Sequence, residues 1–511
     1  MNILEWISIG KVSAERDDLL SKYFYDAGVL KNVINSPSSF LVLGRKGAGK
    51  TAVFKYLSEN KTEFIENNDI LISLSFEDYN WNIHTLLKDK SKAESLAYKQ
   101  SWKFVMYIEC IKAYYNWFEN SNISTPKKIK SANKLLEKLF DSPIPSIGKI
   151  VGKKLLSLSK LRLPKGGLDL DEGNFDSVTL EGGEVSFDDI NKDSSLQSHL
   201  SNNIDNVIIQ LEDAISDLPL KSPNIFICFD RVDESWDEVS FSASKPVITG
   251  LIASSDSISA SFNGKLRPIV FLREDIFEVL EINDSNKLRE DSGELLHWNK
   301  TSLTNLIIRR INYFADLKNV DKIPDIDSLF DKKEMRQRTR PTNYLLKRTM
   351  MRPRDFIAYM GKIIKSMKDK TDDPFADEIV VFEKLEAKSI YDAEPIYSEW
   401  LLQEILDEWK VQKPIIIDLF NSLRNNGYTN FNKEELFEQL KKVSKNTSVE
   451  DINQLIRFLF ENSIVGFKLG ASKEWRFKCF YPSQGFVESS EYRVHEGLVR
   501  ALNLRESRDK E

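Results

Sequence analysis

The sequence predicts an α/β fold with a parallel sheet, and three observations support this prediction. The run Phe40-Leu41-Val42-Leu43 is continuous and apolar, as in a strand buried on both faces. A glycine-rich turn and an amphipathic segment at 51–60 follow it, which gives the order strand, turn, helix. Further strands are expected at 70–76, 224–229 and 268–272.

Helices are expected around and after these strands. The predicted helical segments are 12–35, which ends at a turn at 35–38, then about 93–118, 204–218, 303–314, and 344–367 with an interruption at Pro353. From Ile396 onward, helices are expected at 396–409, 413–425, 432–443 and 449–462, followed by strands at 464–469 and 475–481. The last three helices and the hairpin, in that order, predict a C-terminal winged-helix domain.

Length and composition exclude several classes of protein. The chain has 511 residues and 59.0 kDa, which suggests about three domains, and its net charge is 72 − 78 = −6. No apolar run reaches the ~18 residues of a membrane helix, and the N-terminus carries no basic leader, so we expect a cytoplasmic protein. Three separated cysteines and four histidines argue against a disulfide scaffold, a zinc ribbon and a His-rich metal site. The mild acidity argues against coating nucleic acid by bulk charge.

The turn after the first strand matches the phosphate-loop motif G-x-x-x-x-G-K-[ST]. Its glycines allow consecutive backbone N–H groups to curl around a phosphate, and the following helix adds its N-terminal dipole. Lys50 would reach the β- and γ-phosphates, and the Thr51 hydroxyl would hold Mg²⁺. The predicted nucleotide-binding residues are Gly44, Arg45, Lys46, Gly47, Ala48, Gly49, Lys50, Thr51 and Ala52. The motif predicts a P-loop NTPase with ATP and Mg²⁺ as cofactors.

A second acidic motif follows the strand at 224–229. Asp230 ends this segment and is the candidate for the Mg²⁺ side of the site, together with Thr51. Glu234 is the preferred general base for the attacking water and Asp233 the alternative, since one chain does not tell which carboxylate points at the γ-phosphate.

Both motifs together resemble a group of bacterial P-loop ATPases. The sequence is similar to the bacterial ATPases related to the AAA+, STAND and KAP groups in two segments, FLVLGRKGAGKTAVFKYL and FICFDRVDESWD. The likeness extends to VFLREDIFEVL, LHWNKTSLTNLIIRRI and MRPRDFIAYM, and to AERDDLLSKYF and RVHEGLVRALNL near the two ends. The sequence resembles one bacterial family of this type that carries a C-terminal winged helix. The resemblance implies ATP binding, a helical lid after the ATPase core, and a place in multi-gene stress or phage-defence loci.

The resemblance also implies roles for arginines, because phosphoryl transfer depends on positive charge at the γ-phosphate. Arg273 matches a sensor residue, and Arg352 or Arg354 matches a lid arginine that closes over the phosphates. Arg289 lies where AAA+ relatives carry an arginine finger that acts on a neighbouring subunit. The pair Arg309-Arg310 is expected to face solvent or an interface.

We therefore predict four parts: an N-terminal helical segment at 1–37, an AAA+/STAND-like P-loop core at 38–300, a helical lid at 301–390, and the winged-helix domain at 391–511. Residues 120–200 are a predicted insertion, with a helix at 147–163. Residues 127–165 carry 11 basic and 2 acidic residues, +9, and residues 169–193 carry 9 acidic residues and one lysine, −8. The basic block could contact nucleic acid or a membrane surface, but the adjacent acidic block favours a helix that binds neither.

The predicted function is that of a Mg²⁺-dependent ATPase acting as a molecular switch that self-associates. Since no nuclease, TIR, protease or deaminase signature is recognisable, a defence role would place the effector on a separate partner protein. A nucleic-acid-dependent motor or loader is the alternative, using 127–165 or the winged helix. The exposed side of helix 449–462 is acidic, with Glu450, Asp451 and Glu461, which favours protein contacts over DNA reading. A scaffold that binds ATP with negligible turnover is a third class.

Overall fold

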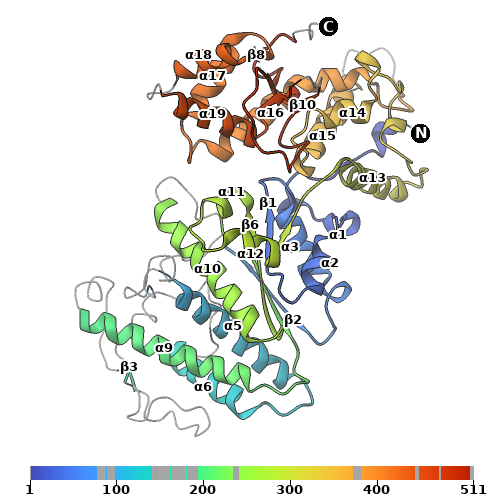
Figure 1. Ribbon diagram of the computed structural model, residues 1–511. Helices are drawn as coiled ribbons and strands as arrows, with labels where there is room; N and C mark the ends of the chain where they lie inside the picture. The colour runs from blue at the N-terminus through green and yellow to red at the C-terminus, as the bar shows by residue number, and fades with distance from the viewer. Residues whose placement is uncertain are drawn as a thin grey trace. The chain divides into compact units, whose positions relative to one another are not determined.

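The computed structural model describes most of the chain. The described residues are 2–76, 84, 88, 98–140, 144, 158, 161–162, 179–180, 194–233, 241–371, 381–443, 448–470 and 474–506. The chain divides into two compact units (Figure 1). Unit 1 comprises residues 1–27, 46–52 and 297–511, and unit 2 comprises residues 28–45 and 53–296. The four-part division predicted from the sequence stays a prediction.

Unit 2 is built on a five-stranded parallel sheet, which confirms the predicted α/β class. The strand order is β2-β5-β6-β1-β7. The strands are β1 (Leu41–Gly44), β2 (Ile70–Ser75), β5 (Ile225–Asp230), β6 (Leu266–Arg273) and β7 (Gly293–Leu295). Every residue of β1 and β5 is buried, as their continuous apolar sequences require. Because β6 lies between β1 and β5, the carboxyl ends of these three strands meet at one edge of the sheet.

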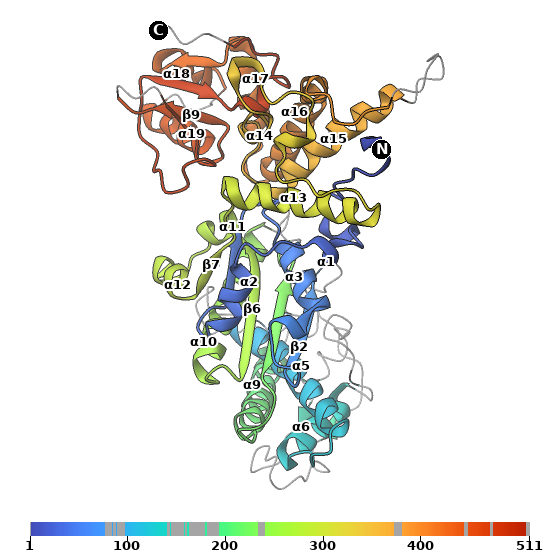
Figure 2. The same ribbon diagram turned by 90° about the vertical axis from the view of Figure 1, so that its right-hand side faces the viewer.

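Long helices complete the core of unit 2. They are α5 (Lys99–Glu119), α6 (Lys127–Phe140), α9 (Ser194–Ser216) and α10 (Phe241–Ser261). Helix α10 packs against β6 and α5, and α5 packs against α6 and α9 (Figure 2). Helix α5 is apolar almost all round, and residues such as Trp102, Tyr107 and Tyr114 are completely buried. The shorter elements of this unit are α2 (Val29–Asn35), most of α3 (Lys50–Glu59), α11 (Glu274–Val279) and α12 (Ser285–Ser292).

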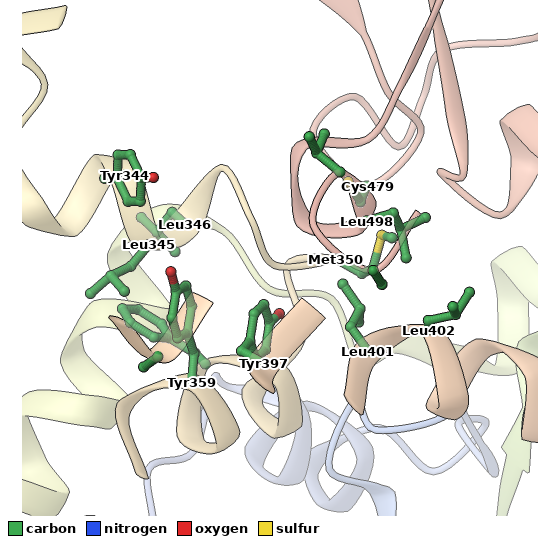
Figure 3. Packing of buried hydrophobic residues seen from close by; sticks show 14 of the residues in the cluster. Tyr344, Leu345, Leu346, Met350, Tyr359, Tyr397, Leu401, Leu402, Cys479 and Leu498 are labelled. Atoms are coloured by element: carbon green, nitrogen blue, oxygen red, sulfur yellow. The ribbon is translucent and has the colours of Figure 1, made fainter. Parts of the chain in front are cut away.

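Unit 1 contains a group of helices in the predicted lid region. They are α13 (Lys300–Leu317), α14 (Pro341–Leu346), α15 (Pro353–Thr371) and α16 (Lys388–Trp409). Figure 3 shows their buried contacts, where Tyr359 of α15 and Tyr397 of α16 stack with ring centroids 4.1 Å apart. A buried ion pair between Arg348 and Glu394 (3.0 Å) adds a polar tie between the end of α14 and α16.

The C-terminal elements follow the order predicted from the sequence, with two further strands. They are α17 (Ile416–Asn426), β8 (Asn430–Asn432), α18 (Lys433–Lys441), α19 (Val449–Glu461), β9 (Val465–Lys468), β10 (Trp475–Arg476) and β11 (Glu491–Val494). The four strands form an antiparallel sheet in the order β10-β9-β11-β8. The apolar stripe of α19 faces the core, with Ile452, Leu455, Ile456 and Leu459 buried.

Three local expectations are wrong. The predicted helix at 12–35 is divided into a 3₁₀ turn at Ala14–Arg16, α1 (Leu20–Tyr23) and α2. The backbone is not helical at Asp17 (ψ +91°) and Phe24 (ψ +136°), and Gly28 takes a left-handed conformation (φ +96°) just before α2. The predicted helix at 147–163 falls mostly outside the described residues, but its end is a short strand, β3 (Leu161–Arg162), paired with β4 (Thr179–Leu180). Arg310 is also buried rather than facing solvent.

The environment of Arg310 explains its burial. Its guanidinium donates to the carbonyl oxygens of Ile9 and Lys11 and pairs with Asp17 (3.3 Å), so it fixes the N-terminal segment on α13. Burial lowers the pKa of Arg310, while the charges of Tyr23 and Asp17 oppose that change.

Candidate functional site

The phosphate loop joins the end of β1 to the start of α3, as the motif predicts. Gly47 (φ +81°) and Gly49 (φ +102°) both occupy the left-handed region, which residues with a Cβ rarely adopt. A Cβ placed on Gly49 would have no heavy atom within 4 Å, so the loop has open space at that point. Helix α3 begins at Lys50, which places the invariant lysine of the motif in the first turn of the helix.

Within unit 1, three donors bind the carbonyl groups of this loop. The Trp298 indole Nε1–H donates to Ala48 O at 2.8 Å, and the Arg352 Nη1 donates to Lys46 O at 3.2 Å. The backbone N–H of Arg354 reaches Gly47 O at 3.5 Å. The Arg354 side chain also lies so close to Gly47 that a Cβ on that glycine would meet the Arg354 Cβ at 3.1 Å. The loop is therefore held from its carbonyl side by the start of α15 and by Trp298.

Arg352 is the buried centre of this arrangement. Its Nε donates to both carboxylate oxygens of Asp355 (3.2 and 3.0 Å), and its Nη1 pairs with Glu408 of α16 at 3.3 Å. Burial alone would lower the pKa of Arg352, but the charges of Asp355 and Glu408 outweigh it and raise the pKa. Because its groups already bind loop carbonyls and carboxylates, the geometry fits a residue that positions the loop.

Arg354, two residues later, is half-exposed. Its Nη1 pairs with Glu404 of α16 at 2.9 Å, and its side chain keeps 30% of its accessible surface. Glu404 and Glu408 are one helical turn apart, so the same face of α16 binds both lid arginines. Of these two arginines, Arg354 has the exposure that a phosphate-sensing residue requires.

In unit 2, the acidic motif lies at the carboxyl edge of the sheet. Asp230 is the last residue of β5 and is 2% exposed. The next residue, Arg231, adopts φ +61°, an unusual value for a residue with a side chain, and the chain turns sharply there. Beyond the turn, Asp233 Oδ2 lies 3.9 Å from Arg273 Nε.

Arg273 ends β6 and pairs across the ladder with Gly44, the first residue of the phosphate loop. Its guanidinium donates to both carboxylate oxygens of Asp275, at 3.1 and 2.6 Å. The predicted sensor thus lies on the strand between the one that leads into the phosphate loop and the one that carries Asp230.

Glu274 connects two further arginines of the sequence prediction. Arg45 Nε lies 3.9 Å from one carboxylate oxygen of Glu274, and Arg289 Nη2 donates to the other. Arg289 also lies 3.7 Å from Glu278. The candidate finger residue therefore pairs within its own chain in this structure.

The structure sorts the predicted residues as follows. Unit 2 contains Gly44, Arg45, Asp230, Asp233, Arg273 and Arg289. Unit 1 contains residues 46–52, Arg352 and Arg354. Glu234 lies outside the described residues. Sequence reasoning missed Trp298, Asp355, Glu404 and Glu408. Asp355 could have been found, because it stands three residues after Arg352 in a helical segment.

The described residues offer neither a metal cluster built from protein side chains nor a membrane-spanning helix. Among the described residues, no group of three or more His, Cys, Asp or Glu side chains could hold a metal ion. Mg²⁺ in nucleotide sites commonly takes only one or two protein ligands beside the phosphates, so this result leaves the predicted Mg²⁺ residues untouched. Within the same described ranges, no helix combines the length and apolar character needed to cross a membrane.

The chain is similar to known proteins in its helical region and over most of its length. A family model described as the FunZ-associated C-terminal helical domain matches residues 301–406. The chain is 24% identical over 525 residues to a transposon gamma-delta 80.3 kDa protein of Escherichia coli (strain K12), a match that covers 97% of this chain and 67% of that protein.

Similar solved structures include three proteins at low identity. They are Drosophila ORC bound to DNA (8% identity, 97% of this chain and 88% of that chain, TM-score 0.30), the Aeropyrum pernix ORC1 protein in complex with DNA (11%, 90% and 90%, TM-score 0.34) and Cdc6p from Pyrobaculum aerophilum (8%, 97% and 94%, TM-score 0.24).

Proposed function

We propose that this protein is a Mg²⁺-dependent ATPase that works as a molecular switch. The observation that carries the proposal is the conformation of the phosphate loop. Gly47 and Gly49 are left-handed, the loop leads into the N-terminus of α3, and Trp298, Arg352 and Arg354 bind its carbonyl groups. A loop anchored from that side is suited to present backbone N–H groups to the phosphates of a nucleotide.

The residues present fit ATP and Mg²⁺. Open space beside Gly49 is what a phosphate requires, and Lys50 supplies a cation in the first turn of α3. The Thr51 hydroxyl and the Asp230 carboxylate are hard oxygen donors of the type that Mg²⁺ prefers. When bound, Mg²⁺ neutralises charge on the phosphate oxygens. In this proposal Asp230, at the carboxyl end of β5, would hold the metal through its carboxylate.

Water activation is assigned to a carboxylate after β5. Asp233 lies 3.9 Å from Arg273 Nε, and this loose pair would orient its carboxylate at the edge of the sheet. Glu234, the base that the sequence favours, lies outside the described residues, and the choice between the two stays open. Arg273, bound to Asp275 and Asp233, is proposed to report on the nucleotide by exchanging one of these carboxylates for phosphate.

The two lid arginines, Arg352 and Arg354, are proposed to have different roles. Arg352 positions the phosphate loop, and Arg354 exchanges Glu404 for the γ-phosphate. Since Glu404 belongs to α16, this exchange would break the ion pair between Arg354 and α16 when ATP binds, while Arg352 keeps its pair with Glu408. Loss of this ion pair on ATP binding would be the conformational switch between the nucleotide-free and the ATP-bound protein.

The sequence resemblance supports three further parts of the proposal. They are self-association through Arg289, a separate effector partner, and a role in bacterial antiviral defence or stress response. Arg289 would have to leave Glu274 and Glu278 before acting on a neighbouring subunit. The proposal predicts a cytoplasmic protein.

Binding and assembly test this proposal. Titration with a fluorescent ATP analogue should give saturable, Mg²⁺-dependent binding to the wild type and a loss of at least tenfold in affinity for Lys50→Ala. The mass of the particle in solution, measured with and without ATP, should rise with ATP in the wild type and not in Arg289→Ala. Equal affinity of wild type and Lys50→Ala would overturn nucleotide binding at this loop. An unchanged mass would remove the self-association.

A further inference from the structure

A loop of unit 1 carries an unusual concentration of positive charge. Residues 332–340, called the basic loop below, contain one acidic residue, Glu334, so the loop has a charge of 5 − 1 = +4. The five cations are exposed: Lys332, Lys333, Arg336, Arg338 and Arg340. The loop leads into α14, within the helical part of unit 1.

Among the described residues, these cations differ from the buried arginines of unit 1 in having no carboxylate partner. Arg310, Arg348 and Arg352 are buried and each pairs with a carboxylate. In the part of the chain that the structure describes, none of the five basic-loop side chains forms an ion pair. The charge of the loop is thus turned to solvent and is available to an external anion.

The backbone beneath the cations is held in a fixed and costly conformation. Buried Met335 donates its N–H to Thr339 O at 2.8 Å, and the Arg336 N–H donates to the Tyr391 hydroxyl at 2.9 Å. Gln337 (φ +59°) and Arg338 (φ +55°) are consecutive left-handed residues with side chains. Residues with a Cβ adopt this conformation at a cost in free energy and keep it only where the surroundings impose it. The base of the loop therefore presents its arginines on a preformed scaffold.

We propose that the basic loop binds the phosphate backbone of double-stranded DNA. Guanidinium groups match phosphate oxygens with paired hydrogen bonds, and a duplex offers phosphates at high linear density. Single strands are usually bound through exposed aromatic rings on which bases stack. Tyr344 is buried, and the Arg336 guanidinium covers the Tyr391 ring at 4.9 Å, so neither ring serves as such a platform.

A second basic surface of the chain serves as an internal control. Helix α6 exposes four lysines at helical spacing, Lys127, Lys130, Lys134 and Lys138, so it too gathers exposed cations in a short stretch of chain. Its remaining lysine, Lys128, pairs with Asp213 (2.9 Å) and Asp217 (3.6 Å), and Glu137 lies on the same helix. Carboxylates therefore accompany the lysines of α6, whereas the basic loop holds only Glu334.

The test compares two triple variants that each remove three charges. One variant, the basic-loop triple, is Arg336→Ala/Arg338→Ala/Arg340→Ala, and the other, the α6 triple, is Lys130→Ala/Lys134→Ala/Lys138→Ala. Each variant and the wild type is titrated, without nucleotide, with a short fluorescein-labelled DNA duplex over a range of salt concentrations. The basic-loop triple is expected to lose at least tenfold in affinity and to reduce the slope of log K against log salt by about 2–3. The α6 triple is expected to change the affinity and the salt slope by much less.

Arg338→Gly separates binding from folding, because glycine relieves the cost of the left-handed backbone at this position. This variant should unfold at the same or a higher urea concentration than the wild type and still bind the duplex more weakly.

Several outcomes would overturn the proposal. They are no binding of the duplex by the wild type, unchanged affinity of the basic-loop triple, and equal losses in both triples. Equal or tighter binding of an RNA duplex or a single strand of the same length would overturn the assignment to double-stranded DNA. Since the measurement uses no ATP, its result is independent of the proposed ATPase function.

Discussion

The indole Nε1–H of Trp298 donates a 2.8 Å hydrogen bond to the carbonyl oxygen of Ala48, 250 residues earlier in the chain. Trp298 precedes α13, so the bond connects the start of the lid helices to the middle of the phosphate loop. Trp298 and Ala48 are both buried, and a buried carbonyl that loses its donor is costly.

Replacing Trp298 by Phe keeps most of the ring and removes the donor. We expect the variant to lose about 1 kcal/mol of stability and to bind ATP several-fold more weakly, since the loop backbone becomes less ordered. Trp102→Phe is the matched control, because Trp102 donates a 2.8 Å bond to Val247 O, away from the phosphate loop in sequence. It should lose similar stability in urea unfolding and keep its ATP affinity. Parallel losses of affinity in both variants would contradict the role of Trp298.

Arg352→Ala should be the most damaging of the lid variants. It removes the donor to Lys46 O and leaves Asp355 (0% exposed) and Glu408 without their buried counter-charge. Breaking such a buried pair costs about 3–5 kcal/mol, so we expect a large drop in the urea midpoint together with weaker ATP binding. A variant with unchanged stability would show that Arg352 does not organise the loop.

Arg354 and Glu404 should respond in opposite directions. Their half-exposed ion pair contributes little to stability, so Arg354→Ala and Glu404→Gln should both unfold near the wild-type midpoint. Arg354→Ala should weaken ATP binding because a phosphate contact is lost. Glu404→Gln should strengthen it, because the carboxylate that competes for Arg354 is neutralised. Titration with the same fluorescent ATP analogue measures both, and a change of the same sign in both variants contradicts the exchange.

His495 should make stability depend on pH. Burial, followed by the charges of Arg348 and Arg352, lowers the pKa of His495 to about 3. Above pH 6.5 the ring is neutral in both the folded and the unfolded state. Below pH 6.5 only the unfolded state takes up a proton, so stability falls by up to about 1.4 kcal/mol per pH unit until the pH approaches 3.

His495→Asn isolates this effect. The Nδ1 of His495 accepts the N–H of Gly497 at 3.1 Å, and the Asn side-chain oxygen can replace it as acceptor. We expect the variant to lose roughly 2 kcal/mol less than the wild type between pH 7 and pH 5 in urea unfolding. His199→Asn, at an exposed position, is the control. Identical pH profiles for wild type and His495→Asn would refute this assignment.

The parts of the site with a local signal were predictable from the sequence. The strand at 40–43, the phosphate loop and the helix after it follow one another directly, and the apolar run that ends at Asp230 is a buried strand. The C-terminal helices were also predictable, because amphipathic periodicity is a local property, as the buried stripe of α19 illustrates. The short strands β8 and β11 were not predicted, and the strand expected at 475–481 is limited to Trp475–Arg476.

Other features depend on contacts between distant residues. The partner of Arg352 on α16, Glu408, is 56 residues away, so the motif alone could not separate a loop-positioning arginine from a phosphate sensor. The predicted helix 12–35 is divided by non-helical backbone at Asp17, Phe24 and Gly28, whereas the apolar residues there show helical spacing. The burial of Arg310 depends on carbonyl groups of the N-terminal segment, about 300 positions earlier.

The central claim is that the phosphate loop supports ATP hydrolysis with a carboxylate after β5 as the base. Release of inorganic phosphate from ATP with Mg²⁺ should be measured for the wild type, Lys50→Ala, Asp233→Asn and Glu234→Gln. We expect turnover by the wild type, a loss of at least a hundredfold in Lys50→Ala, and a similar loss in one of the two carboxylate variants, which still binds ATP. Two results would contradict this claim. One is a rate equal to that of the wild type in Lys50→Ala and in both carboxylate variants, and the other is ATP binding without any turnover by the wild type.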